Sequence, residues 1–271
     1  MTQVKELIFQ DARRQLITGA ALSFIALIFI IGFITMNPSG ILLSLIYSAI
    51  FTISGLGLLR TGYLDWKKAK QTEADFETDD TKATYERVPA RMYLGQKPMK
   101  SYQAGLFAMD GELYGEIQEE VGLKQKFLTG ITAIFSFDTV RSADFLLKDK
   151  SGSMLYRVEK KGGFSWRGYV QNKHGNYVAY TKDTKNKGKQ ITQYIEHDQW
   201  RWSAEGDAVI GHFTITDQDG ARWAIIKRGA IPTEAVDRFE RMPGYLVEWK
   251  KRDNIPASLI AFLFLLQSRD R

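Results

Sequence analysis

The sequence predicts a mainly β protein, an antiparallel closed barrel around a hydrophobic C-terminal helix, preceded by a two-helix transmembrane hairpin. Three observations carry this prediction. Two long uncharged runs lie near the N-terminus, short apolar stretches separated by Gly-containing turns follow, and a last apolar run is too short to cross a bilayer. With 271 residues, the chain has room for an anchor and one substantial domain.

The hairpin is predicted over residues 16–59, after a short cytoplasmic segment of residues 1–15. Residues 16–36 and 41–59 contain no charged side chain, and each run is long enough to cross about 30 Å of hydrocarbon as a helix. Pro38 and Gly40 in the connecting turn end one helix and begin the next, which leaves only an antiparallel pair. A cleaved signal peptide is the alternative, but its apolar region is shorter and no second run follows it at once.

The flanking charges predict the orientation of the hairpin. Both outer flanks are basic and the connecting turn is uncharged, so both chain ends should face the cytoplasm. We therefore expect an integral protein of a bacterial plasma membrane. No ionisable residue lies within either run, which favours an anchor over an ion path. The basic flanking residues are Lys5, Arg13, Arg14, Arg60, Lys67, Lys68 and Lys70.

Residues 60–89 are interpreted as a juxtamembrane linker. From Asp65 the composition becomes polar, and five acidic residues lie between Glu73 and Asp80. Such a run is typical of a solvated stalk, and a docking segment for a basic partner is the alternative. Pro89 ends the segment.

Residues 90–271 are predicted to form antiparallel strands. Four β-hairpins are expected, because an apolar stretch, a polar turn that contains Gly and a second apolar stretch recur. Residues 182–190 are expected to be a polar loop, and Gly162 and Gly163 another turn. The four hairpins cover residues 106–117, 145–158, 169–180 and 213–226.

The central helix is predicted over residues 255–267. Pro256 suits the first turn of a helix, and residues 255–266 are apolar except for Ser258. A helix of this length extends about 18 Å, which is too short to span a bilayer. Since it is apolar on all sides, we expect it to be buried inside the β domain. A third membrane segment or an interfacial helix is the alternative.

The strand-turn-strand pattern followed by an apolar helix resembles the tubby C-terminal-like superfamily, which includes LURP-one-related proteins and phospholipid scramblases. The motif F-x-x-x-D-x-x-G occurs as Phe145 to Gly152 and again as Phe213 to Gly220. The resemblance implies a closed barrel of about 12 strands over residues 90–271, around the C-terminal helix. The sequence departs from the family pattern because its anchor is N-terminal.

Composition and motifs argue against several classes of chemistry. Cysteine is absent, and beyond residue 60 there remain 33 basic and 29 acidic residues (37 less 4, and 31 less 2), so we expect no nucleic-acid partner. His174, His197 and His212 match no metal-site spacing, and the Asp217 segment is read as a hairpin turn. No nucleotide-binding or hydrolase motif occurs. We expect no metal, no cofactor and no catalytic residue.

Basic side chains are the best binding candidates in the sequence. Five of them fall on consecutive predicted strands and turns, and the resemblance implies a basic cavity that binds phosphoinositide headgroups. Scattered surface cations are the alternative interpretation. The five residues are Arg157, Lys160, Lys161, Arg167 and Lys173.

The predicted function is a membrane-anchored, non-catalytic module at the cytoplasmic membrane face. Its partners are expected to be the lipid bilayer together with anionic phospholipid headgroups or an unknown protein. The alternatives are a scramblase-like phospholipid transporter and an enzyme whose site has no visible motif.

Overall fold

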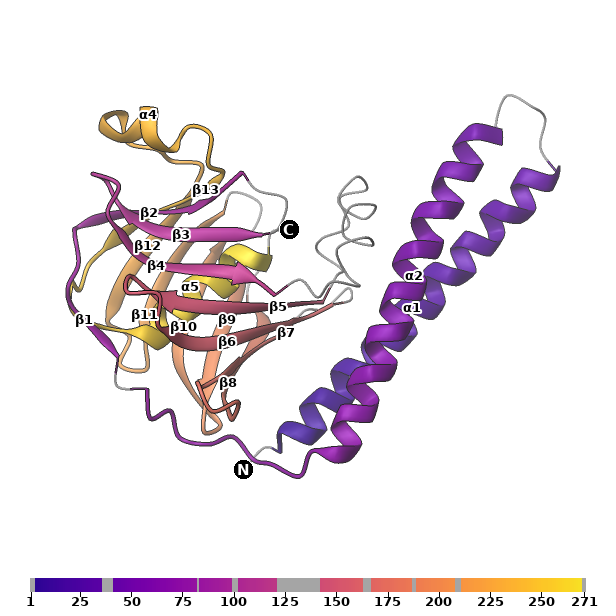
Figure 1. Ribbon diagram of the computed structural model, residues 1–271, viewed down its shortest axis with the longest axis horizontal. Helices are drawn as coiled ribbons and strands as arrows, with labels where there is room; N and C mark the ends of the chain where they lie inside the picture. The colour runs from indigo at the N-terminus through magenta and orange to yellow at the C-terminus, as the bar shows by residue number, and fades with distance from the viewer. Residues whose placement is uncertain are drawn as a thin grey trace.

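The chain folds into a long helical hairpin that lies beside a closed β-barrel (Figure 1). The structure is a computed structural model, and it describes residues 3–35, 41–81, 83–98, 102–120, 142–162, 167–186, 189–207 and 211–269. The predicted fold class is confirmed: the domain is mainly β, two apolar helices precede it, and a third helix ends the chain.

The hairpin consists of helices α1 (Val4–Thr35) and α2 (Ile41–Gln71), which are 32 and 31 residues long. Both are long and apolar enough to cross a membrane. Large apolar side chains are exposed along them, including Ile34 at 75% and Leu42 at 72%. Each helix also continues beyond the predicted span at its charged end, so the hairpin is longer than its apolar part. The predicted turn at residues 37–40 lies outside the described residues.

Small residues bring the two helices together. A Cβ atom added to Gly55 would lie 2.9 Å from the Ser23 backbone nitrogen and 3.0 Å from the Gly19 carbonyl oxygen, closer than side chains tolerate. A Cβ atom added to Gly57 would meet nothing within 4 Å. Gly55 therefore lies in the contact between the helices and Gly57 does not.

The barrel closes in the order β10-β11-β12-β13-β2-β3-β4-β5-β6-β7-β8-β9, and neighbouring strands are antiparallel throughout. A separate pair, β1 (Thr84–Arg87) and β14 (Asp253–Pro256), joins the entry and the exit of the barrel. The barrel strands are β2 (Arg91–Gln96), β3 (Gln103–Ala108), β4 (Leu113–Glu119), β5 (Ala143–Asp149), β6 (Met154–Lys161), β7 (Arg167–Gln171), β8 (Tyr177–Asn186), β9 (Lys189–Glu196), β10 (Gln199–Asp207), β11 (His212–Asp217), β12 (Arg222–Arg228) and β13 (Gly244–Trp249).

All four predicted hairpins form, and the repeated motif accounts for two of their turns. The Asp149 carboxylate accepts hydrogen bonds from the backbone N–H groups of Ser151 and Ser153, at 2.8 and 2.9 Å. Gly152 then adopts a φ of 82°, which glycine reaches without strain. In the second copy, Asp217 accepts from two backbone N–H groups in the same way. The sequence motif is thus a turn motif.

The expected loop at residues 182–190 is replaced largely by strand. Strand β8 continues to Asn186 and β9 begins at Lys189, and the two pair along this length. Over residues 182–186 strand β8 pairs with β9 alone, and β9 pairs on its other side with β10 as far as Gln190. Residue 163 of the predicted Gly162–Gly163 turn lies outside the described residues.

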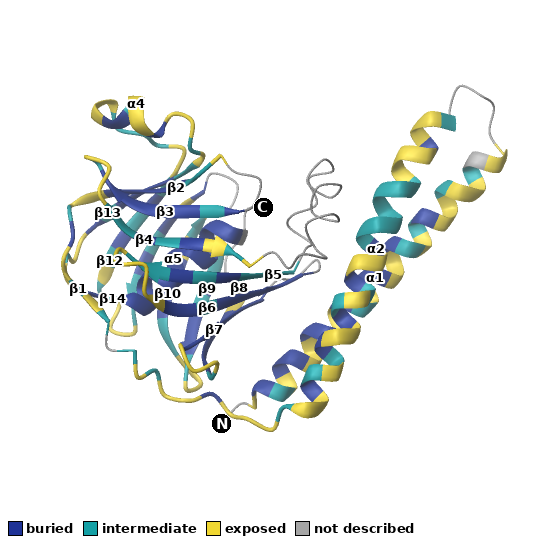
Figure 2. Ribbon diagram, viewed as in Figure 1, coloured by how far each residue is buried: buried dark blue, intermediate teal, exposed yellow. Residues whose placement is uncertain are grey.

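Helix α5 (Ala257–Arg269) fills the barrel interior, as predicted (Figure 2). Residues 257–265 are at most 2% exposed, and their side chains pack with the inward-facing residues of the surrounding strands. A second, smaller apolar cluster lies outside the barrel, where Phe239 of the short helix α4 (Val236–Phe239) packs on Tyr93 and Phe107. The short helix η3 (Thr233–Ala235) precedes α4 in the β12–β13 connection.

The predicted stalk is not a free segment where the structure describes it. Helix α2 continues through Gln71, with Asp65 buried. Beyond the helix, Phe76 is buried against barrel tyrosines and the Asp79 carboxylate accepts a hydrogen bond from the Tyr156 hydroxyl at 2.6 Å. The acidic composition therefore reflects contacts with the barrel as well as exposure to solvent.

Candidate functional site

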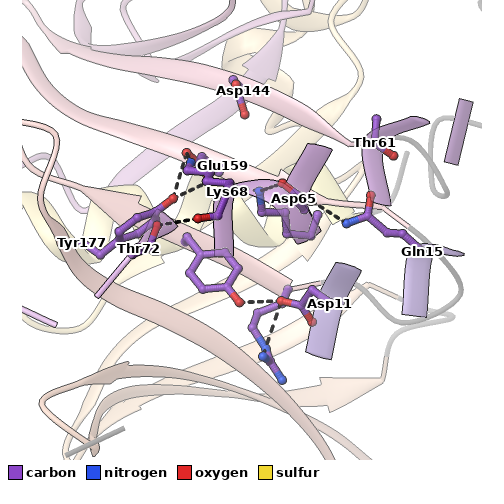
Figure 3. Close-up of polar contacts among 12 residues, drawn as sticks. Asp11, Gln15, Thr61, Asp65, Lys68, Thr72, Asp144, Glu159 and Tyr177 are labelled. Atoms are coloured by element: carbon purple, nitrogen blue, oxygen red, sulfur yellow. Dashed lines mark hydrogen bonds and ion pairs between the residues drawn. The ribbon is translucent and has the colours of Figure 1, made fainter. Parts of the chain in front are cut away.

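Polar side chains of both helices and of the barrel meet where the base of the hairpin lies against the barrel, and Figure 3 labels Asp11, Asp65 and Glu159 among them. We call this group the polar junction. It joins two helices to three neighbouring strands, and most of its members are almost fully buried. The polar junction consists of Asp11 and Gln15 of α1, Asp65 and Lys68 of α2, Glu159 and Lys161 of β6, Arg167, Tyr169 and Gln171 of β7, and Tyr177 of β8.

An apolar cluster lies beside the polar junction at the lower end of the hairpin. Val4, Ile8 and Ala69 of the helices are at most 1% exposed, and they pack with Tyr180 and Ile195 on the outer surface of the barrel. These tyrosine-rich strand positions point away from α5, because alternate residues of a strand face opposite sides. The hairpin therefore covers an apolar face of the barrel.

Glu159 and Lys161 form the centre of the polar junction. The Lys161 ammonium lies 2.8 Å from the Asp65 carboxylate and 3.2 Å from the Glu159 carboxylate. Lys68 donates to Glu159 at 2.9 Å, and Gln15 donates to Asp65 at 2.8 Å. Helix α2 and strand β6 thus each contribute one carboxylate and one ammonium group, and each ammonium group lies against a carboxylate of the other element.

A second set of contacts ties the first helix to strand β7. The Arg167 guanidinium lies 3.4 Å from the Asp11 carboxylate and 3.5 Å from the Leu7 carbonyl oxygen. The Tyr169 hydroxyl donates to the same carboxylate. Asp11 is 2% exposed and Arg167 8%, so this pair is withdrawn from water.

The electrostatics hold Glu159 and Lys161 in their charged forms. Burial opposes ionisation of Glu159, yet the ammonium groups of Lys161 and Lys68 lower its pKa to about 2. Burial likewise opposes the charge on Lys161, but Glu159 and Asp65 raise its pKa above the ordinary value. Mutual stabilisation of opposite charges is typical of a structural ion-pair network.

Acid is expected to weaken the junction. Glu159 has a folded-state pKa below its ordinary value of 4.5, so its contribution is fully present above about pH 4.5 and is lost as the pH falls toward about 2. The difference corresponds to roughly 3 kcal/mol at full ionisation. Urea unfolding of the bilayer-embedded chain at pH 6, 4 and 3 measures this loss, and Glu159→Gln should make the pH dependence shallower. An unchanged slope in that variant would contradict the prediction.

The structure separates the five cations that the sequence predicted as a binding group. Lys161 and Arg167 belong to the polar junction. Lys160 points into the barrel, where its ammonium donates to the Ser268 carbonyl oxygen at 2.7 Å, near the end of α5. Arg157 pairs with Glu120 at 2.9 Å and Asp144 at 3.5 Å, and Lys173 is exposed in the β7–β8 turn. Three of the five are buried and engaged with the protein, so the five do not line one surface.

Sequence reasoning did not identify the polar junction. Glu159 was not singled out because it lies in a predicted strand among basic residues. Asp65 was assigned to the juxtamembrane linker, and Lys68 was counted among the basic residues that predict the orientation of the hairpin. A usable signal was present in their spacing. Asp11 and Gln15, four apart, and Asp65 and Lys68, three apart, each place polar groups on one face of a helix. Within the described ranges, no three His, Cys, Asp or Glu side chains gather as metal ligands do.

Comparisons with known proteins give little further information. No family model matches the chain, and no curated protein matches it. The X-ray structure of an Arabidopsis thaliana protein is similar to this chain, with a TM-score of 0.42 and 13% sequence identity, over 70% of this chain and 95% of that chain. Membership of the tubby-like superfamily therefore stays a prediction.

Proposed function

We propose that this chain is an integral membrane protein whose hairpin holds a non-catalytic, tubby-like barrel against the cytoplasmic face of the bilayer, where it binds anionic phospholipid headgroups. The observation that carries the proposal is the position of the polar junction along the hairpin. Asp11 lies five residues before the apolar run of α1, and Asp65 lies six residues after that of α2. At 1.5 Å per residue, both are within about 9 Å of the ends of the apolar runs.

This spacing suits a barrel that lies immediately outside the hydrocarbon. The apolar runs expose large side chains such as Phe24, Leu27 and Leu56, which water would solvate poorly and lipid tails would cover. The ion pairs between the hairpin and the barrel involve Asp11, Asp65 and Lys68, which lie outside the two apolar runs. Buried ion pairs form only when each charge meets its partner, whereas two apolar surfaces can pack in several relative positions. The polar junction therefore favours a single orientation of the barrel relative to the hairpin.

Exposed cations at the base of the hairpin support anionic headgroups as the ligand. Arg13, Arg60 and Lys67 are exposed beside the ends of the two apolar runs. Lys70 lies 3.6 Å from the centre of the Trp66 ring, a combination common at membrane interfaces. Cations in this position gain from the negative surface potential of the cytoplasmic leaflet.

A non-catalytic role fits the way the polar groups are used. The lumen of the barrel is occupied by α5, and the carboxylates of the polar junction are engaged by lysine, arginine, glutamine or tyrosine. Such groups contribute rigidity, because moving one of them would leave a buried partner without its opposite charge. The tubby-like assignment itself is supported by the barrel around a C-terminal apolar helix.

Lipid retention tests this proposal. The full chain, reconstituted in bilayers that contain phosphatidylglycerol and phosphatidylcholine, is extracted in mild detergent and its retained lipids are measured by mass spectrometry. Phosphatidylglycerol should be enriched several-fold over the bulk mixture, and Arg13→Gln, Arg60→Gln and Lys67→Gln together should remove most of the enrichment. A matched triple variant, Arg87→Gln, Arg91→Gln and Lys150→Gln, removes exposed cations of the barrel domain that lie away from the hairpin and should retain it. Absence of enrichment would overturn the proposal.

A transport assay distinguishes the scramblase-like alternative. Vesicles that contain the chain and a fluorescent lipid are treated with a membrane-impermeant reductant. If the chain only binds headgroups, the protected inner-leaflet fraction should equal that of protein-free vesicles. Faster loss of that fraction would replace binding with lipid transport.

A further inference from the structure

The strand directions near the polar junction relate the two ends of the barrel to the hairpin. The base of the hairpin is the end that contains Val4 and Ala69, and it contacts Tyr177 and Ile195 of the barrel. Closer to the apolar runs, Asp65 contacts Lys161 and Asp11 contacts Arg167. Lys161 is the last residue of β6 and Arg167 is the first of β7. Strand β6 therefore runs up the hairpin, away from its base, and the last residue of β6 and the first residue of β7 lie at the upper end.

The antiparallel order extends this direction around the whole barrel. Strands β2, β4, β6, β8, β10 and β12 end at the same rim, and β3, β5, β7, β9, β11 and β13 begin there. The tight turns that contain Gly111, Gly152, Gly175 and Gly220 lie at the other rim. We call the first the upper rim and the second the lower rim.

The central helix follows the same direction. Lys160, at the upper end of β6, donates to the carbonyl oxygen of Ser268 near the C-terminal end of α5. The beginning of α5 lies at the lower rim, directly after β14. Figure 1 agrees, because the last turn of the yellow helix α5 lies on the side of the barrel that faces the hairpin.

We infer that the described strand ends of the upper rim, with Glu120 and Asp144 beside the hairpin, lie against the bilayer headgroups. The inference rests on the proposed function, since it requires the hairpin to span the membrane. Its occupant is the headgroup layer of the same bilayer, because the upper rim is continuous with the apolar runs through the contacts of Lys161 and Arg167. Along β6 the lower rim lies about 23 Å from the upper rim, the length of seven residues.

This orientation places Lys173 on the side of the barrel away from the headgroups. The residue lies in the β7–β8 turn at the lower rim, so it faces away from the bilayer that holds the hairpin. The sequence prediction instead assigned Lys173 to headgroup binding. The two placements differ by the full height of the barrel and can be told apart by one measurement.

Site-specific quenching in bilayers tests the inference. The chain contains no cysteine, so one introduced cysteine carries one fluorophore. Glu120→Cys and Asp144→Cys report on the upper rim, Lys150→Cys and Lys173→Cys report on the lower rim, and Ile28→Cys reports on the spanning run. Four of the five positions are exposed, and the Asp144 side chain is 46% exposed. Each labelled full-length chain is reconstituted in vesicles that carry nitroxide either on the headgroup or on the acyl chain.

The expected result has three parts. The label at Ile28 is quenched by acyl-chain nitroxide, upper-rim labels are quenched several-fold more strongly by headgroup nitroxide than lower-rim labels, and Lys173→Cys behaves as Lys150→Cys. Quenching at Ile28 with equal or reversed quenching at the two rims would overturn the inference and leave the membrane anchor in place. A label at Ile28 that is not quenched would overturn the proposed function and this inference with it.

Discussion

Leu263→Lys is expected to abolish folding of the barrel. Leu263 lies in the middle of α5, fully buried among apolar side chains, and no described carboxylate reaches the centre of this helix. An isolated ammonium there must be desolvated or lose its proton, and either costs several kcal/mol. Because domains of this kind have only about 5–15 kcal/mol of stability, a large share of it would be lost.

Urea unfolding of the reconstituted full-length chain, followed by tryptophan fluorescence, measures this loss. Leu263→Ala tests the same site more gently and should cost about 2–5 kcal/mol. Met154→Lys places the same charge on the outer surface of β6, where the side chain is 37% exposed, and should stay within about 0.5 kcal/mol of the parent. A cooperative, parent-like transition in Leu263→Lys would contradict a central buried helix.

Lys161→Met is expected to cause the second-largest effect. The substitution keeps the volume of the side chain but leaves Asp65 and Glu159 without the ammonium group that lies between them. Removing one member of a buried ion pair typically costs about 3–5 kcal/mol, because the remaining charge stays desolvated. The barrel should therefore unfold at a clearly lower urea concentration, and the hairpin should remain in the bilayer.

Lys189→Met provides the matched control. Lys189 lies 3.2 Å from Glu205, the same separation as that between Lys161 and Glu159, but its side chain is 66% exposed and that of Glu205 is 51% exposed. Exposed pairs of this kind contribute about 0–1 kcal/mol. Similar losses in the two variants would mean that the polar junction is solvated in the bilayer-embedded protein.

The barrel was predictable because its signals are local. Alternating apolar residues mark the strands, and Asp149 and Gly152 mark a turn through hydrogen bonds that span four residues. The role of α5 followed from its length, since a helix too short to cross a bilayer and apolar on every face must be buried. The extension of the hairpin to Gln71 was missed because a polar helix and a polar linker have similar composition.

The polar junction was not predictable because its pairs are remote in sequence. Lys161 and Asp65 are 96 residues apart, and Arg167 and Asp11 are 156 apart. A single sequence records the charge of each residue but not its partner, so buried lysines in β6 had the same appearance as surface lysines. This is why Lys161 and Arg167 were assigned to a lipid site, whereas they connect the barrel to the hairpin.

The most direct test of the hairpin–barrel account is a double-mutant cycle between Asp65 and Lys161. The unfolding free energy of the barrel is measured in bilayers for Asp65→Asn, Lys161→Met and the combination. If the two side chains meet as described, the losses are strongly non-additive, with a coupling energy of about 1–3 kcal/mol. Additive losses would contradict the account, because the barrel would then not be held to the hairpin through the polar junction.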